Sequence, residues 1–415
     1  MDQAVPPSLG EEITARIDAL AAISATPDAI TRVFLTPQHR RAADMLMAWM
    51  REAGMAAHLD AIGNVCGRYE GASSGRSCLM LGSHYDTVRD AGRWDGPLGI
   101  ITAIACVADL HRRHVRLPFA VEIIGFADEE GVRFGSTLLG SRAVAGTLDR
   151  RVFDSTDVDG VSMRDAMAAF GLDAALVGQA ARARGDIHAY LELHIEQGPV
   201  LESEHLPVGV VTAISGATRL AVSLAGFAGH AGTVPMALRR DALAGAAECI
   251  VAIESLCKSD EALVGTVGII DARPGATNVI PGRVSFTVDV RSASDADRKR
   301  AVTDIARRIE AIARRRDLVP QIDVTHESGA VSCALWLSSQ IGDAIAAEGH
   351  RILTLPSGAG HDGMAMIDIT AIAMIFVRCR GGISHNPAEH ASVEDVDTAA
   401  RVMLRVIENF RPVGP

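Results

Sequence analysis

The chain has 415 residues, of which 48% are hydrophobic and only 4% aromatic, and its formal net charge is −11 at pH 7. A chain of this length exceeds one ordinary hydrophobic core, so we expect two domains. The acidic balance, without a basic cluster, argues against nucleic acid as a partner. The seven cysteines include no Cys-x-x-Cys pair, which favours buried free thiols in a reducing compartment.

The N-terminal residues are acidic and lack the basic region followed by an apolar region that marks a signal peptide. No uninterrupted apolar stretch approaches the ~20 residues that a membrane span needs. We therefore expect a cytoplasmic protein that has no membrane partner.

The first half of the chain alternates predicted helices and strands. Helical periodicity over 11–24 and 37–53 predicts two helices, and residues 56–71 have the alternation of a strand, a turn and a strand. A buried strand, an apolar helix and a second buried strand follow, and the order predicts a βαβ unit in a mixed or parallel sheet. These segments are residues 77–87, 96–113 and 119–131, followed by a further strand in 186–198.

The pattern changes after about Ile214 to the order βαββαβ, which is the ferredoxin-like arrangement. Helix and strand patterns resume from Val331 to the end. We expect an α/β protein whose large catalytic domain, residues 1–214 and 329–415, contains a mixed α/β sheet. A smaller ferredoxin-like α+β domain, residues 215–328, would be inserted as a lid or dimerisation domain.

Polar side chains follow four of the predicted strands. His84 and Asp86 come just after the first buried strand, the run Asp128–Glu130 after the second, His194 at the end of the third, and His385 after the last. In open α/β sheets, ligands bind beyond the carboxyl ends of the strands. A single His or Asp at such a place is more often a cap or a turn residue, but four of them at one sheet edge indicate a site.

The sequence FADEEG, from Phe126 to Gly131, places carboxylates side by side after an apolar strand. Adjacent carboxylates repel each other unless a cation or a proton lies between them. Two divalent metals sharing a bridging carboxylate would remove the repulsion, and imidazole with carboxylate ligands suits Zn, Mn, Co or Ni. Such a site activates water and polarises a carbonyl, so the pattern predicts metal-assisted hydrolysis with a neighbouring carboxylate as general base.

The motifs of the chain closely resemble those of the amidase, hydantoinase and carbamoylase branch of the dinuclear metallopeptidase-like amidohydrolases. They follow the family's order from His84 to His390. The motifs are GSHYDT, DGPLG, ADEEGVRF, HIEQGPVLE, GFAGHAGT, ATNVIPG, DVR, SGAGHDGM and GISHNPAEH.

The resemblance implies two divalent metal ions per subunit and a role for each site residue. Asp95 would bridge the metals, Glu129 would be the general base and acid, and Asp86 would fix the tautomer of a metal-binding histidine. Gln197 would contact substrate beside the metals. The remaining metal ligands would be His84, Glu130, His194 and His385.

Within the predicted inserted domain, the resemblance implies that His230 stabilises the oxyanion. Asn278 and Arg291 would bind a substrate carboxylate, because the guanidinium fork matches a carboxylate. Gly360 and His361 would shape the pocket floor. Alternative readings stay open for these residues: a turn residue for His230, a turn cap for Asn278, a surface ion pair for Arg291, and a loop buttress for His361.

The resemblance also implies a homodimer that takes a small ureido substrate with a carboxylate. It leaves open whether His230, Asn278 and Arg291 act within their own subunit or in the partner. The first hypothesis is hydrolysis of N-carbamoyl-L-amino acids to the L-amino acid, CO2 and ammonia. The alternative is an allantoate amidohydrolase, with β-ureidopropionase and ureidoglycolate amidohydrolase in the same branch. A hypothesis of another class is a binding protein without activity, against which the complete set of ligands and the base argue.

Overall fold

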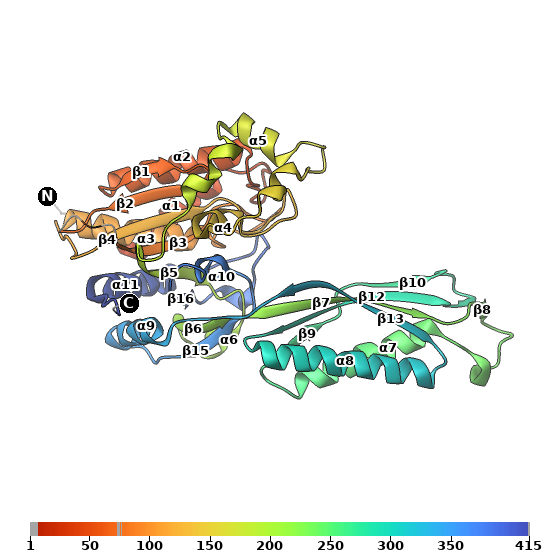
Figure 1. Ribbon diagram of the computed structural model, residues 1–415. Coiled ribbons are helices and arrows are strands. Elements are labelled where there is room, and N and C mark those ends of the chain that lie inside the picture. The colour runs from red at the N-terminus through yellow and green to blue at the C-terminus, as the bar shows by residue number, and fades with distance from the viewer. Residues whose placement is uncertain (1–6, 73–74, 76, 414–415) are drawn as a thin grey trace. The chain divides into compact units, whose positions relative to one another are not determined.

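The computed structural model describes residues 7–72, 75 and 77–413. The chain divides into two compact units (Figure 1). The larger unit comprises Met1–Thr212, Ser332–Leu355 and Ala359–Pro415, and the smaller comprises Ala213–Val331 with Pro356–Gly358. The mixed α/β architecture confirms the predicted fold class.

A mixed nine-stranded sheet is the centre of the larger unit, with the order β1-β2-β4-β3-β5-β16-β6-β14 and β15 paired to β6. The strands β4, β3, β5 and β16 are neighbours and run parallel. β3 and β4 are buried at every residue, as strands covered on both faces must be. The strands are β1 (Ala56–Leu59), β2 (Val65–Tyr69), β3 (Cys78–His84), β4 (Ala120–Phe126), β5 (Ile187–Ile195), β6 (Val208–Ile214), β14 (Val331–Ser332), β15 (Thr354–Ser357) and β16 (Ile372–Val377).

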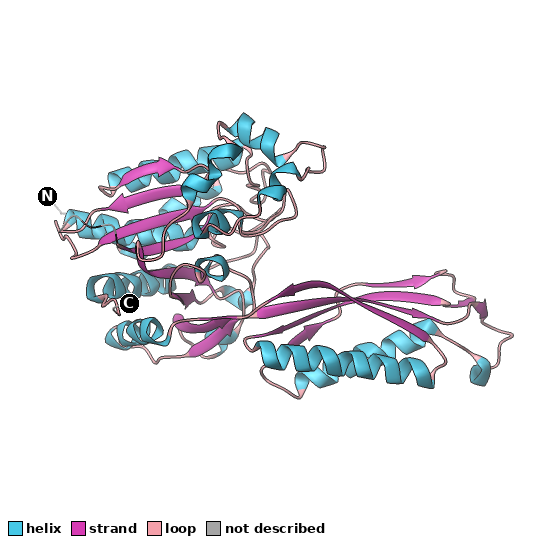
Figure 2. Cartoon of the chain, in the orientation of Figure 1, coloured by secondary structure: helices cyan, strands magenta, loops and turns pink. Residues whose placement is uncertain are grey.

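Helix α3 (Pro97–Arg112) packs on β3, β4 and β5 and on helices α1 and α11. It begins at a proline, which suits the first helical position, and its N-cap Gly96 has φ +82°, a conformation that favours glycine. Figure 2 shows how helices cover the strands of this unit. The other helices are α1 (Leu9–Ala21), α2 (Pro37–Glu52), α4 (Leu139–Ala145), α5 (Met163–Phe170), α6 (Val200–Ser203), α9 (Leu335–Ala347), α10 (Gly363–Met366) and α11 (Val393–Asn409), with 3-10 turns η1 (Arg150–Asp154), η2 (Ala174–Ala180) and η4 (Arg380–Gly382).

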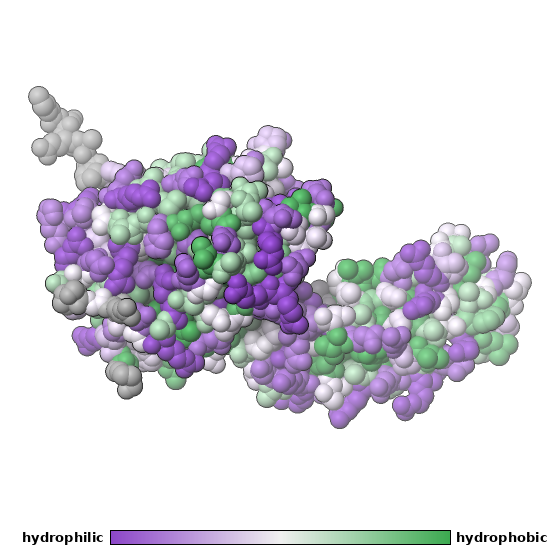
Figure 3. Space-filling model, turned by 45° about the horizontal axis from the view of Figure 1, so that its top comes forward, coloured by the Kyte–Doolittle hydropathy of each residue, from purple (hydrophilic) through white to green (hydrophobic). Residues whose placement is uncertain are grey.

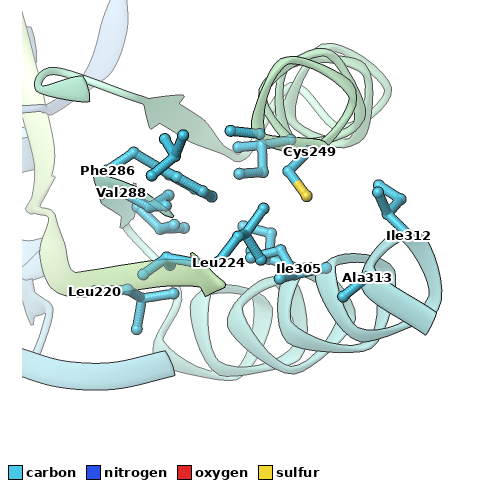
Figure 4. Close-up of a cluster of buried hydrophobic side chains, with 14 of the residues drawn as sticks. Leu220, Leu224, Cys249, Phe286, Val288, Ile305, Ile312 and Ala313 are labelled. Atoms are coloured by element: carbon cyan, nitrogen blue, oxygen red, sulfur yellow. The ribbon is translucent and has the colours of Figure 1, made fainter. Parts of the chain in front are cut away.

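The smaller unit contains an antiparallel sheet with the order β10-β12-β7-β13, on which helices α7 and α8 pack, and β9 pairs with β12. This order is the ferredoxin-like one that the sequence predicts. Its core lies between the sheet and the two helices and includes Leu220, Phe286 and Ile305 (Figure 4). The elements are β7 (Gly216–Ala225), β8 (Gly229–His230), η3 (Met236–Leu238), α7 (Ala242–Lys258), β9 (Val264–Thr266), β10 (Ile270–Arg273), β11 (Val279–Ile280), β12 (Arg283–Ser292), α8 (Asp295–Arg315) and β13 (Val319–Ser328).

The chain leaves the larger unit and returns to it at neighbouring points. The backbone N–H of Cys333 donates a hydrogen bond to the carbonyl oxygen of Thr212 at 2.9 Å. The inserted segment therefore begins and ends on adjacent strands, which is the arrangement that lets one domain interrupt another.

All seven cysteines are buried and form no disulfide, as their spacing predicts. Among the described residues, no helix is both long enough and apolar enough to cross a membrane.

Hydrophobic side chains reach the surface of the smaller unit, where Figure 3 shows them among polar ones. The exposed hydrophobic residues of this unit include Phe227, Met236, Leu238, Val264, Ile269, Val319 and Val324.

Gly99 sets how closely α3 approaches β5, because a Cβ there would overlap the carbonyl oxygen of Leu193. We expect Gly99→Ala to destabilise the fold by about 1–3 kcal/mol, the usual cost of overpacking. Gly178→Ala is the matched control, since nothing lies within 4 Å of a Cβ there. Thermal unfolding of the two variants measures the difference, and equal melting temperatures would contradict the packing argument.

Candidate metal centre

The carboxyl ends of four parallel strands bring the predicted metal ligands to one edge of the larger sheet. β3 ends at His84, β4 precedes Glu129 and Glu130, β5 carries His194, and the loop after β16 carries His385. The order β4-β3-β5-β16 makes these four strand ends neighbours. The sheet topology therefore brings together residues that are up to 301 positions apart in the chain.

Asp95, which immediately precedes the N-cap of α3, is the central side chain. Its Oδ1 lies 3.3 Å from Nε2 of His84 and 3.1 Å from Nε2 of His194. Its Oδ2 lies 3.1 Å from Nε2 of His385, which is also 3.4 Å from Oε1 of Glu130. The two oxygens of one carboxylate thus face two different sets of ligand atoms.

Two groups of potential metal ligands share Asp95. One consists of His84, Asp95 and His194, and the other of Asp95, Glu130 and His385, each with its ligand atoms within 4.8 Å of one another. His84, Glu129 and Glu130 form a third such group, so Glu129 is within reach of the same region. This is the geometry that a bridging carboxylate between two cations requires.

The ring orientations of two histidines fit metal binding. Nδ1 of His84 lies 3.1 Å from the carbonyl oxygen of Asp86, and Nδ1 of His194 lies 2.9 Å from that of Ile195. A proton on Nδ1 makes each of these contacts a hydrogen bond and leaves the Nε2 lone pair directed at Asp95. Nε2 of His194 is buried and forms no hydrogen bond in the described part of the chain. A cation between these nitrogens and the carboxylate would satisfy all of them.

Asp86 connects two parts of the site. Its carboxylate accepts hydrogen bonds from the backbone N–H groups of Glu129, at 3.0 Å, and Glu130, at 3.3 Å. Its Oδ1 is 3.5 Å from Nδ1 of His84, farther than its own carbonyl oxygen. Asp86 therefore holds the backbone of the two glutamates directly, in addition to lying behind His84.

The protein without metal concentrates charge at this edge. Burial, partly offset by His84, raises the pKa of Glu129 well above its usual value, and burial raises that of Glu130 to about 7. Burial alone would lower the pKa of His84, but the carboxylates of Asp86 and Asp95 raise it well above 6.5. Burial alone would raise the pKa of Asp95, but His194, His385 and His84 hold it well below 3.8. The carboxylates thus need positive charge nearby to be ionised together.

Two buried side chains that sequence reasoning missed hold the start of the Asp128–Glu130 loop. Oδ1 of Asn64 accepts a hydrogen bond from the backbone N–H of Ala127 at 2.9 Å, and Nε2 of His39 lies 2.8 Å from the carbonyl oxygen of the same residue. Burial lowers the pKa of His39 to about 3, so its ring is neutral. No local pattern marks either residue, since both are recognisable only by their distant partner.

Gln197 lies beside the predicted metal ligand Asp95. Its Nε2 donates hydrogen bonds to Oδ2 of Asp95, at 2.8 Å, and to Oγ of Ser384, at 3.0 Å. Its Oε1 is buried and has no hydrogen-bond partner among the described residues. Gln197 and His385 have φ values of +57° and +54°, which only a strained backbone adopts at non-glycine residues and which recur at functional sites.

Gly360 and His361, for which the resemblance implies a place in the pocket floor, lie near this centre. A Cβ at Gly360 would be 3.8 Å from Oε1 of Glu129, so the glycine leaves space beside that carboxylate. The ring of His361 is buried and lies edge-on to that of His194, with 4.5 Å between their centroids. Such a contact would hold the ring of His194, a predicted metal ligand, in place.

In the smaller unit, His230 and Asn278 lie together, because β8 pairs with β11 and the N–H of Ala231 bonds to the carbonyl oxygen of Asn278 at 2.9 Å. Both side chains are exposed. β12 begins at Arg283, five residues after Asn278, and Arg291 lies near its other end. At ~3.4 Å per residue, the eight steps from Arg283 to Arg291 span roughly 27 Å. The structure therefore does not bring Arg291 to the same place as His230 and Asn278.

The guanidinium of Arg291 already donates three hydrogen bonds within the chain. Nε and Nη2 donate to the carboxylate of Asp289 at 2.9 and 3.1 Å, and Nη1 donates to the carbonyl oxygen of Gly358 at 2.8 Å. These three bonds use three of its five N–H groups. The other two, one on each terminal nitrogen, point away from Asp289 and could still bind a carboxylate.

This set of histidines and carboxylates around a shared aspartate is that of a metal-dependent hydrolase. The sequence matches peptidase family M20/M25/M40 over residues 80–409. The chain belongs to this family and, within it, to the hydantoinase and carbamoylase amidases. It is an amidohydrolase that acts on carbon–nitrogen bonds other than peptide bonds.

Relatives are similar over nearly the whole chain. Allantoate deiminase 1 of Glycine max is 41% identical over 99% of this chain and 91% of its own. N-carbamoyl-L-amino acid amidohydrolase of Geobacillus stearothermophilus is 40% identical over 96% of this chain and 98% of its own. A crystal structure of a hydantoinase/carbamoylase family amidase from Burkholderia multivorans has a TM-score of 0.92 at 30% identity, covering 97% and 98% of the two chains.

The raised pKa of Glu130 predicts how the stability of the metal-free protein, prepared with a chelator, depends on pH. A carboxyl whose pKa is raised from 4.5 to about 7 favours folding when protonated, and that contribution is lost as the pH rises through 7. Gln cannot ionise, so we expect metal-free Glu130→Gln to melt at a higher temperature than metal-free wild type at pH 8. The two melting temperatures should converge near pH 5, and a difference that grows toward low pH would contradict the assignment.

Proposed function

We propose that the chain hydrolyses the ureido carbon–nitrogen bond of N-carbamoyl-L-amino acids, giving the L-amino acid, CO2 and ammonia. The observation that carries the proposal is the pair of ligand groups sharing Asp95, with Glu129 within reach of both. The relative of Geobacillus stearothermophilus, at 40% identity, is named for this activity. Two divalent cations, of Zn, Mn, Co or Ni, would be held by His84, Asp95, Glu130, His194 and His385.

Glu129 is the general base and acid in this proposal. Cations bound at this site would make water more acidic and polarise the ureido carbonyl. Glu129 accepts the proton of the attacking water and returns it to the nitrogen that leaves when the C–N bond breaks. Asp86 accepts a hydrogen bond from the backbone N–H of Glu129, and two residues earlier Asn64 accepts one from the backbone N–H of Ala127. These hydrogen bonds fix the backbone of Glu129 and leave its side-chain carboxylate free to exchange protons.

Gln197 supports a ureido substrate. Its amide nitrogen donates to Asp95 and Ser384, so its oxygen is the part of the amide that is left for another partner. That buried oxygen has no partner in the described part of the chain and needs an N–H donor. A ureido group carries N–H on both sides of its carbonyl, whereas an ester carries none.

The smaller unit supports a homodimer with shared sites. Arg291 is roughly 27 Å along β12 from Arg283, the end of that strand nearest in sequence to Asn278. The pair His230 and Asn278 is therefore too far from Arg291 for all three to contact one small substrate within one chain. If all three bind the same molecule, a second copy of the chain must supply one of the two groups. The exposed hydrophobic residues of this unit provide apolar surface for that contact.

Allantoate is the second candidate substrate. Allantoate deiminase 1 of Glycine max is as similar to the chain as the carbamoylase is, at 41% identity. Both substrates combine a carboxylate with a ureido group, and the same catalytic residues would process either. The difference lies in the pocket for the rest of the molecule.

A substrate panel tests the proposal: N-carbamoyl-L- and D-amino acids, N-carbamoyl-β-alanine, allantoate and ureidoglycolate, with ammonia release measured in the presence of Mn²⁺. We expect the highest kcat/KM with an N-carbamoyl-L-amino acid. Glu129→Gln should reduce kcat by about 100- to 10,000-fold, the usual contribution of a positioned acid or base. Preference for allantoate would move the assignment to the second candidate, and full activity of Glu129→Gln would overturn the mechanism.

A mixing experiment tests the shared site. Glu129→Gln and His230→Ala are each expected to be nearly inactive alone. If His230 acts in the partner's site, a heterodimer of the two has one intact site of two, so random exchange of protomers restores about a quarter of wild-type activity. Mixing without any recovery, although exchange is verified by mass, would place His230 in its own subunit's site.

A further inference from the structure

Glu389 is a buried carboxylate beside the metal centre that the proposed mechanism does not use. It is 3% exposed, although Asn386, Ala388 and His390 around it are exposed. Its Oε1 accepts hydrogen bonds from the backbone N–H groups of Trp94, at 2.7 Å, and Asp95, at 3.1 Å. The chain therefore turns this glutamate inward, against the backbone of the shared aspartate.

The second oxygen of Glu389 reaches the other loop of the site. Oε2 lies 3.0 Å from Oγ of Ser384, the residue before His385. Glu389 thus joins the segment that carries Asp95 to the segment that carries His385. It forms no ion pair with Lys, Arg or His within the described residues, so hydrogen bonds are what hold its carboxylate.

The hydroxyl of Ser384 lies between two carboxylates. Oγ of Ser384 is 2.8 Å from Oδ2 of Asp95 and 3.0 Å from Oε2 of Glu389, but it has one proton to donate. Gln197 already donates one N–H to Oδ2 of Asp95 and its other N–H to Ser384. Ser384 therefore links the carboxylates of Asp95 and Glu389 and also accepts from Gln197, so that one hydroxyl joins three side chains of the site.

We propose that Glu389 is a positioning residue that fixes the backbone of Asp95 and, through Ser384, the segment that carries His385, so that Asp95 keeps the geometry needed to bridge two cations. This inference rests on the metal centre of the proposed function. It adds a role for two residues, Glu389 and Ser384, that are not themselves ligands.

A steric observation supports the same role independently. A Cβ at Gly92 would overlap the Cβ, Cδ and Oε1 atoms of Glu389. The backbone at Gly92 therefore lies directly on the glutamate side chain and confines it. A side chain that only filled space would not need both this close contact and three hydrogen bonds.

The test is direct binding of Mn²⁺ to the full chain, measured by chelator competition, with no substrate present. In Glu389→Gln a neutral amide replaces the carboxylate that accepts from the backbone N–H groups of Trp94 and Asp95 and contacts Ser384, and hydrogen bonds to a neutral group are weaker. We expect its affinity for the more weakly held Mn²⁺ to fall about 10- to 100-fold, as when a partner of a metal ligand is replaced. Glu389→Ala should fall at least as far, and kcat should decrease more than KM changes.

Ser384→Ala provides a second variant that leaves Glu389 in place, and it should weaken the same Mn²⁺. Because both residues act through one chain of hydrogen bonds, the effects of Ser384→Ala and Glu389→Gln should be less than additive. The matched control is Glu394→Gln, which removes an equal charge from an exposed position five residues away. Its Mn²⁺ binding should equal that of wild type.

The outcomes separate the two proposals. Unchanged Mn²⁺ binding in both Glu389→Gln and Ser384→Ala, or an equal loss in Glu394→Gln, would overturn the role of Glu389 and leave the proposed function standing. A wild-type chain that binds a single Mn²⁺ would overturn the bridging role of Asp95, and this inference with it. A lower melting temperature without weaker Mn²⁺ binding would show that Glu389 serves only the fold.

Discussion

The contacts of one buried carboxylate organise the metal centre. Asp95 faces His84 and His194 with one oxygen and His385 with the other. Without cations this edge of the sheet holds ionisable groups whose charges oppose one another, and burial makes each uncompensated charge costly. A fold selected for stability alone would place apolar residues here. The cost is understandable only if a ligand supplies the missing positive charge.

The strand-end rule made most of this site predictable from the sequence. Apolar strands followed at once by His or carboxylate groups are visible in a sequence, and a parallel sheet brings such ends together. The polar residues that support the predicted ligands are different, because their partners are remote: Asn64 and His39 lie 63 and 88 positions from Ala127. No periodicity or spacing encodes contacts of that range.

In the smaller unit, too, the sequence predicts the order of the elements but not the details of their pairing. The order of strands and helices follows from the alternation of apolar residues, and the ferredoxin-like sheet results. The second strand of this order is divided in the structure into β9 and β10, which pair with different parts of β12. The distance between Asn278 and Arg291 likewise depends on the full length of β12, and a sequence motif contains no such information.

The entry and exit of the inserted segment have a further consequence. Thr212 and Cys333 are bonded neighbours, so the path of the larger unit would be continuous if a short turn replaced everything between them. The ligand groups sharing Asp95 come entirely from the larger unit. The insertion is in this sense a module that evolution can exchange, enlarge or remove. The inserted segment and the ligand groups can therefore diverge at different rates within one gene.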